Sequence, residues 1–285
     1  MFLSIKFDKI FSTNMPERPN TLGLERENNV AKIERFIEQV TATYRAENIP
    51  IGIDGRINMR AYAGIHFDLE KDLARNREYD REWFGDVSEA QILEKRRQRE
   101  GEQLEMLAYG IFIKNLTEEF VVARASSHDD RANKVDTVIL DRKTGAIICA
   151  FDEVGDTMGI DYEKKQALVR DYNLKGGASL KYGIGIVEKD KKKIITLSSV
   201  ANIPLFYIAL PSDRIKKGMK EFMPDPGNQS EFEEKLFIYF VAIINAQIQA
   251  LELYSRRLDP NLKKKLEAFK RIMSSLGSGA DRKRK

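Results

Sequence analysis

Two short apolar runs rich in β-branched residues, at 135–140 and 146–151, flank a polar turn at 141–145. Valine, isoleucine and threonine are favoured in strands, and Gly145 supplies the positive φ angle that a short hairpin loop requires. The pattern therefore predicts a β-hairpin. Further apolar runs predict four more strands, at 118–125, 182–187, 194–198 and 205–210.

Apolar residues that recur at every third and fourth position predict helices around these strands. The expected helices cover 25–47, 89–114, 161–173, 231–258 and 260–276. The second of them changes from polar to apolar at Gly101, where we expect it to bend or break. We expect Asp86 or Ser88 to cap that helix and Ser230 to cap the fourth.

This order of elements predicts an α/β (α+β) fold, a mixed central β-sheet flanked by helices, with helical N- and C-terminal extensions. The predicted division is an N-terminal arm and helical extension at 1–88, an α/β core at 89–212, a C-terminal helical hairpin packed on the core at 228–277 and a basic disordered tail at 278–285. Within the first part, the arm to residue 24 is expected to be loosely structured. Tyr79, Trp83 and Phe84 are expected to dock a partly helical segment at 67–88 onto the body.

The composition is that of a globular protein with a heavily charged surface, since 42% of the residues are hydrophobic and 32% are charged. The net charge of +4 does not by itself indicate nucleic acid. The lone cysteine, Cys149, excludes a disulfide within the chain, which fits a reducing, cytoplasmic compartment. The apolar run 236–244 is too short to span a bilayer, so we expect a buried helix there and no membrane segment.

Acidic residues lie at unusual positions in the predicted hairpin. Asp136 falls inside its first strand, and Asp152 and Glu153 end the second. A carboxylate within a strand is costly unless it is exposed, paired or bound to a metal ion. Antiparallel strands bring such ends within a few ångströms, which suits a divalent cation. The alternative is an acid on the solvent-facing side of a strand.

Alternation along the second strand lets only one of Asp152 and Glu153 share the face of Asp136, and we favour Asp152. Glu105 lies on the apolar face of its helix and can point inward. Asp129 and Asp130 are expected to be loop or capping acids, close enough to the strand for one to reach the metal ion or its waters.

The two histidines, His66 and His128, and the single cysteine do not support a zinc site. His128 stands beside Asp129 and Asp130, so it is either a general base or, more simply, a partly exposed loop histidine.

Taken together, the motifs resemble the PD-(D/E)XK, restriction-endonuclease-like nuclease superfamily over residues 90–210. The matching residues are Glu102 and Glu105 on a helix, Asp136 in KVDTVI, Asp152 and Glu153 in CAFDEV, and Lys164 and Lys165 in EKKQ on the next helix. The resemblance implies that Asp136 and an acid of the following strand bind Mg²⁺, that a helical glutamate assists, and that a lysine positions or activates water. The family lysine position is occupied by Val154. In some family members this lysine lies on the following helix, which makes Lys165 or Lys164 the candidate.

The expected function is that of an endo- or exonuclease that depends on Mg²⁺ or Mn²⁺ and hydrolyses phosphodiester bonds. DNA is the expected substrate in preference to RNA, and the expected processes are restriction, repair or recombination. The expected catalytic residues are Asp136, Asp152, Lys165 and Glu105, and the expected metal ligands are Asp136, Asp152 and Glu153.

The alternative function is that of a catalytically degenerate relative that binds nucleic acid or serves in an assembly. The missing in-register lysine, the basic tail and the long apolar helix at 231–258 favour it. The same C-terminal helices allow a homodimer. The basic segments 189–193 and 214–220 are either solvated hairpin tips or contacts to a phosphate backbone.

Overall fold

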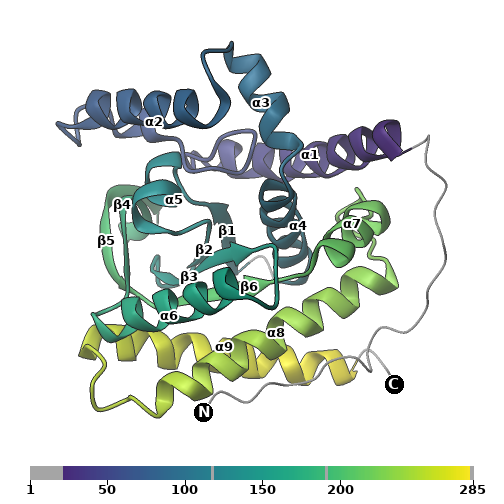
Figure 1. Ribbon diagram of the computed structural model, residues 1–285. Helices are drawn as coiled ribbons and strands as arrows, with labels where there is room; N and C mark the ends of the chain where they lie inside the picture. The colour runs from purple at the N-terminus through teal and green to yellow at the C-terminus, as the bar shows by residue number, and fades with distance from the viewer. Residues whose placement is uncertain (1–21, 117–118, 190–191, 283–285) are drawn as a thin grey trace.

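The computed structural model describes residues 22–116, 119–189 and 192–282. Its strands are β1 (Phe120–Arg124), β2 (Thr137–Asp141), β3 (Ile147–Val154), β4 (Ala178–Lys189), β5 (Lys192–Ile203) and β6 (Leu205–Ala209). They form a four-stranded sheet in the order β1-β2-β3-β6 and a separate β4-β5 hairpin (Figure 1). The pairs β1–β2 and β2–β3 are antiparallel, and β3 and β6 are parallel. The predicted mixed sheet flanked by helices is therefore confirmed.

The helices surround this sheet. They are α1 (Leu22–Ala46), α2 (Leu69–Phe84), α3 (Glu89–Arg97), α4 (Glu100–Asn115), α5 (Ser127–Asn133), α6 (Ile160–Leu174), α7 (Ser212–Glu221), α8 (Glu231–Glu252), α9 (Pro260–Arg282) and the short 3₁₀ helix η1 (Met59–Tyr62). Because β3 and β6 are parallel, the chain must cross over between them, and it does so through α6 and the β4–β5 hairpin.

The predicted central hairpin is present as β2–β3, and its turn is tied to β4. Gly145 has φ +68°, and its carbonyl oxygen accepts a hydrogen bond from the Ile186 amide at 3.3 Å. A Cβ atom at this position would lie 1.6 Å from the Ile186 carbonyl oxygen. Glycine is thus required both by the backbone conformation and by the close approach of β4.

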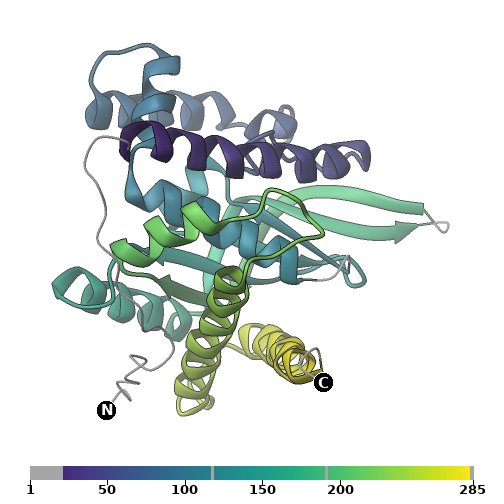
Figure 2. The same ribbon diagram turned by 90° about the vertical axis from the view of Figure 1, so that its right-hand side faces the viewer.

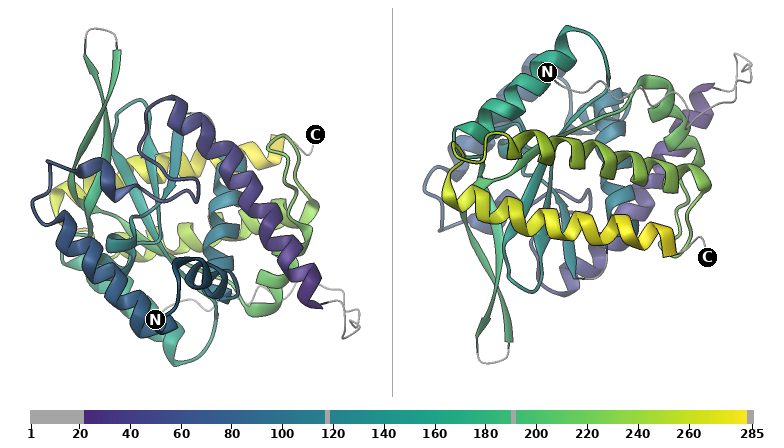
Figure 3. Two further views of the ribbon diagram at one scale, coloured as in Figure 1. Left: turned by 90° about the horizontal axis from the view of Figure 1, so that it is seen from above. Right: turned by 90° about the horizontal axis from the view of Figure 1, so that it is seen from below.

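The sheet separates two hydrophobic cores. On one face, α1, α4, α7, α8 and α9 pack together, and the Phe112 ring on α4 stacks on Phe151 of β3 with ring centroids 4.9 Å apart. The other face carries η1, α6 and the β4–β5 hairpin, with Tyr62 and Tyr182 fully buried. Figure 3 shows α8 and α9 side by side beneath the sheet. Both faces are therefore covered, which fits the near-continuous apolar runs of β2 and β3.

Among the described helices, α8 is the one with the length and apolar composition to cross a membrane. In the fold it packs on α4, α7, α9 and β6, and Phe240 and Ile244 on it are fully buried. These contacts fit the predicted core helix, and the absence of a membrane segment stays a prediction.

Several local expectations hold and others need correction. Ser88 and Ser230 both form capping boxes, with Gln91 and Glu233 as their partners. The break in the helix from residue 89 falls at Gln98–Arg99, just before Gly101.

The expected docking of Trp83 is wrong. Its side chain is 67% exposed, and the Arg99 guanidinium lies 4.6 Å from its ring centroid. The cation–π contact covers one face of the ring without burying it.

The basic segment 214–220 forms most of α7, so the expectation of a hairpin tip is wrong there, and its contact with a phosphate backbone stays a prediction. Ile215 and Met219 of α7 are buried in the core that contains α4 and α8. The predicted tail at 278–285 also differs, because α9 continues to Arg282. Residues 283–285 and the predicted arm before residue 22 lie outside the described residues.

The β4–β5 hairpin extends well away from the body of the molecule (Figure 2). Ile186, near the outer end of β4, is hydrogen-bonded to the turn of β2–β3. Asp136 and Asp152 lie at the opposite ends of β2 and β3. The outer end of the hairpin therefore does not line the acidic ends of these strands.

Candidate metal centre

The backbone of Asp136 is fixed between two neighbouring strands immediately before β2. Its amide donates to the Phe151 carbonyl oxygen at 2.8 Å, and its own carbonyl oxygen accepts the Ala125 amide at 2.7 Å. Its carboxylate Oδ2 accepts the amide of Glu153 at 2.8 Å. The side chain of Asp136 is thereby held against the end of β3 and is 7% exposed as a residue.

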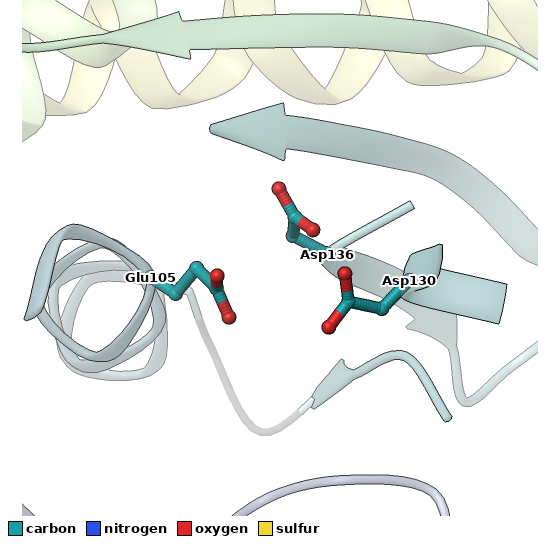
Figure 4. A group of neighbouring side chains, drawn as sticks. All are labelled: Glu105, Asp130 and Asp136. Atoms are coloured by element: carbon teal, nitrogen blue, oxygen red, sulfur yellow. The ribbon is translucent and has the colours of Figure 1, made fainter. Parts of the chain in front are cut away.

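Three carboxylates from separate elements converge beside this point (Figure 4). Glu105 comes from α4, Asp130 from α5 and Asp136 from the start of β2, and one oxygen of each lies within 4.8 Å of the others. Among the acidic, histidine and cysteine side chains of the described residues, these three acids have the geometry to hold a metal ion, and they form the candidate metal-binding group. Its donors are all hard carboxylate oxygens, which suit Mg²⁺, Mn²⁺ or Ca²⁺.

The two aspartates of the short helix α5, Asp129 and Asp130, have different partners and therefore different roles. Asp129 is fully buried and accepts hydrogen bonds from the amides of Lys181 and Tyr182 at 2.7 and 3.1 Å. It also accepts the Ser126 hydroxyl at 2.7 Å. Asp129 therefore anchors α5 to β4 from the first turn of the helix, whose N-cap is Ser126, and Asp130 is left to approach Glu105 and Asp136.

Asp152, on β3, forms an ion pair with Lys165 on α6 through its Oδ1 atom. The neighbouring Lys164 is 71% exposed in its side chain and pairs with Asp161 instead. Of the two lysine candidates, Lys165 is thus the one that meets the acidic end of the sheet. Val154, two residues after Asp152, stays on β3 and is half-buried.

The two acids that end β3 lie outside the group of three, but their negative charges act on Asp136 and raise its pKa. Asp152 and Glu153 are 3% and 9% exposed. Oδ2 of Asp152 and both carboxylate oxygens of Glu153 are buried and accept no hydrogen bond from the described residues. Buried acceptors are rarely left without a partner, so these atoms leave coordination capacity for a cation or its waters.

Two arginines that the sequence did not single out pair with the acids of α4. Arg124 of β1 forms ion pairs with Glu102 and Glu105, and its side chain is 3% exposed. Arg56 donates to Glu105 Oε2 at 3.0 Å and to Asp130 Oδ2 at 2.9 Å. The position of Arg124 in the apolar run VVARA was a usable signal, because a buried arginine needs an acidic partner. No comparable signal marks Arg56.

Burial governs the ionisation of this site. It raises the pKa of Asp136 well above its usual range, and the charges of Glu105 and Glu153 raise it further. Burial also raises the pKa of Glu153, to about 7. The pKa of Asp152 is likewise raised by burial, although Lys165 opposes the shift. A bound cation would favour the charged forms of these acids.

The two glutamates of α4 are shifted in opposite directions. Burial and the charge of Glu102 raise the pKa of Glu105. Burial also disfavours ionised Glu102, but the charges of Arg124 and Arg56 outweigh it and hold the Glu102 pKa at about 2. Glu102 is therefore the more acidic of the two glutamates.

His128 points to a different set of partners. Its Nδ1 lies 3.5 Å from Asp72, and its ring packs edge-on against Tyr182. The contacts found for His128 within the described residues do not include the three acids of the metal-binding group. These contacts favour the simpler expectation, a structural histidine, over a general base.

Comparisons with models of protein families, with curated proteins and with solved structures found no match for this chain.

Proposed function

We propose that this protein is a metal-dependent nuclease that hydrolyses phosphodiester bonds of nucleic acid. The observation that carries the proposal is the convergence of Glu105, Asp130 and Asp136, beside the Asp152–Lys165 ion pair. Acids that bind a divalent cation next to a lysine are the groups that metal-assisted phosphodiester hydrolysis requires.

The arrangement of elements supports this proposal. One helix, α4, precedes three antiparallel strands, and the chain then crosses through α6 to a strand parallel to the third. The PD-(D/E)XK superfamily, which the motifs resemble, places its acids at equivalent points of such a core. DNA is the expected substrate, and the choice between DNA and RNA is an outcome of the assay below.

The donor set and the unpartnered oxygens of Asp152 and Glu153 fit Mg²⁺ or Mn²⁺. Glu105, Asp130 and Asp136 would hold the ion, with Asp152 and Glu153 adjacent to it. When bound, such an ion supplies a Lewis acid for the phosphoryl oxygens and lowers the pKa of water.

The residues of this chain would then divide the remaining work. Lys165, held by Asp152, keeps a positive charge at the end of β3, where it can orient an attacking water and stabilise negative charge on the phosphate. The Glu153 amide donates to Asp136 Oδ2 and so holds this carboxylate beside Glu105 and Asp130.

A degenerate, binding-only relative is the second candidate. Val154 at the family lysine position and the ion pairs of Arg56 with Glu105 and Asp130 favour it. The two candidates differ in one measurable property, namely turnover that depends on a divalent cation.

The test incubates the purified chain with end-labelled double-stranded DNA, single-stranded DNA and RNA, in Mg²⁺, Mn²⁺ or chelator. We expect cleavage that the chelator abolishes. Asp136→Asn should lower it by more than about 100-fold, which exceeds the usual cost of losing an outer-shell partner of a metal ligand. Asp161→Asn is the matched control, because the Asp161 side chain is 88% exposed on α6. Cleavage that survives in Asp136→Asn, or no cleavage of any substrate, would contradict the nuclease assignment.

A further inference from the structure

The guanidinium of Arg56 lies between two of the three acids of the metal-binding group. Its Nη1 atom is 2.9 Å from Asp130 Oδ2, and its Nη2 atom is 3.0 Å from Glu105 Oε2 and 3.6 Å from Glu102 Oε2. The side chain is 12% exposed. No ion pair to Asp136, the third member of the group, is found among the described residues. Arg56 is therefore the one of the two neighbouring arginines that pairs with both Glu105 and Asp130, whereas Arg124 pairs with Glu105 alone of the group.

The position of Arg56 is built into the backbone. The Gly55 carbonyl oxygen accepts the Arg124 amide, and the Ile57 amide donates to the Arg124 carbonyl oxygen, each at 2.9 Å. Segment 51–57 closes on itself through the Ile51–Ile57 bridge and the Gly52-to-Arg56 hydrogen bond of 2.7 Å. It therefore forms a short extra edge beside β1 that presents one arginine to the acids.

A tight contact fixes the turn of this segment. Gly55 has φ +82°, and a Cβ atom there would lie 2.9 Å from the Tyr109 ring. Asp54 accepts the Arg56 amide at 3.1 Å and approaches its Nε at 4.0 Å. The charged groups facing Arg56 are thus Asp54 from its own segment, Glu102 and Glu105 from α4, Asp130 from α5 and Arg124 from β1.

We propose that Arg56 competes with the divalent cation for Glu105 and Asp130. The inference rests on the proposed function. A carboxylate that accepts two charged donors is a weaker ligand for a metal ion, and a guanidinium repels a divalent cation held a few ångströms away. Binding of the ion therefore requires Arg56 to release at least one of the two carboxylates.

The release leaves a positively charged group at the edge of the metal site. Arginine stays protonated at all ordinary pH values and forms bidentate contacts with phosphate. Arg56 is then placed to contact a phosphate oxygen of the nucleic acid. It thus differs from Arg124, which is 3% exposed and pairs with Glu102 and Glu105 but not with Asp130.

The test measures Mn²⁺ binding without nucleic acid, by titration followed with electron paramagnetic resonance of the free ion. We expect Arg56→Gln to bind Mn²⁺ at least about 10-fold more tightly than the wild type, because one nearby positive charge is gone. Arg56→Lys, which keeps the charge, should stay close to the wild type. Arg97→Gln is the matched control, because Arg97 forms an arginine–glutamate pair, with Glu34, outside this site.

The outcomes separate this inference from the proposed function. Wild-type binding that Arg56→Gln leaves unchanged or weakens overturns the competition and leaves the metal site intact. Absence of Mn²⁺ binding in both proteins overturns the metal site as well. If Arg56→Gln binds Mn²⁺ and the wild type does not, Arg56 competes strongly enough to prevent binding, and the proposal is supported.

A second measurement covers the case in which Arg56→Gln does not fold. In the wild type, nitrogen-15 NMR can follow the guanidinium protons of arginines held in ion pairs. We expect Mg²⁺ to abolish the protection of the Arg56 signal and to leave that of Arg97 unchanged. An Arg56 signal that stays protected at saturating Mg²⁺ overturns the proposal.

Discussion

Lys165 on α6 makes an ion pair with Asp152 at the end of β3, and thereby brings a lysine to an acidic strand end that carries Val154 and no lysine of its own. The crossover that makes β3 and β6 parallel places α6 beside both strands. A lysine on this helix can therefore serve the same end of the sheet as a lysine on β3.

Replacing this lysine should separate metal binding from turnover. We expect Lys165→Met to lower Mg²⁺-dependent cleavage by about 100-fold or more, the usual cost of losing one charge stabiliser. Mn²⁺ affinity should be kept or rise, because a nearby positive charge is lost. Lys164→Met, on the exposed neighbouring residue, should leave both properties unchanged. Equal activity of the two variants would exclude a catalytic role for Lys165.

The stability of the metal-free protein should depend on pH through the buried acids. Burial raises the pKa of Glu153 from its ordinary value of 4.5 to about 7 in the folded state. Between these two values the unfolded chain loses a proton that the folded chain retains, so the free energy of unfolding falls as pH rises. The loss attributable to Glu153 is of the order of 3 kcal/mol, and Asp136 and Asp152 act in the same direction.

Denaturant unfolding between pH 4.5 and 8 measures this dependence. Glu153→Gln should make the fall between pH 4.5 and 7 less steep, since glutamine does not titrate and the contributions of Asp136 and Asp152 remain. Glu102 acts oppositely, because its pKa is lowered from 4.5 to about 2 in the folded state. The stability that it contributes is lost only as the pH falls from 4.5 toward 2. A free energy of unfolding that rises from pH 4.5 to 7 would contradict the direction of the Glu153 shift.

The two aspartates of α5 should respond differently to the same replacement. Asp129→Asn places an amide donor against the amides of Lys181 and Tyr182, so we expect a loss of stability of about 1–3 kcal/mol. Asp130→Asn should instead weaken Mn²⁺ binding with a smaller effect on stability. Urea unfolding and Mn²⁺ titration of both variants check the division, and a reversed pattern would refute it.

The turn between β2 and β3 offers a test of the fold. Gly145→Ala combines a positive φ angle with a Cβ atom 1.6 Å from the Ile186 carbonyl oxygen. Gly64→Ala is the matched control, because Gly64 has φ +81° and a Cβ atom added there would meet no atom of the described residues within 4 Å. We expect Gly64→Ala to cost about 1 kcal/mol and Gly145→Ala clearly more, since β4 must move. Equal losses of stability for the two variants, measured by thermal or urea unfolding, would mean that the close approach of β4 to Gly145 does not add to the cost of the substitution.

The sequence predicted the central hairpin, most helices and the residues of the strand ends because these follow from short-range periodicity. Asp152 and Lys165 belong to β3 and α6, which such periodicity defines, and Asp136 directly precedes β2. By contrast, α5 has only seven residues, too few for a helical pattern of apolar positions.

The ion pairs of the site could be identified only from the folded structure and not from the sequence. Arg56 lies in a short turn-like segment, and its partners lie on α4 and α5, far along the sequence. Neither spacing nor residue type near Arg56 distinguishes it from an ordinary surface arginine. Long-range ion pairs of this kind depend on tertiary packing, which local patterns do not encode.

The pairing of segment 51–57 with β1 also limits how this protein can be divided. A boundary at residue 88, where the α/β core was expected to begin, would leave Glu102, Glu105 and Asp130 on one fragment and Arg56 on the other. The same cut would remove α1, whose Ile33 and Phe36 are completely buried in the core with α4. Recombination or domain exchange at that boundary would thus transfer the acids with Arg124 but without Arg56, the partner of Asp130, and would remove a helix of the core.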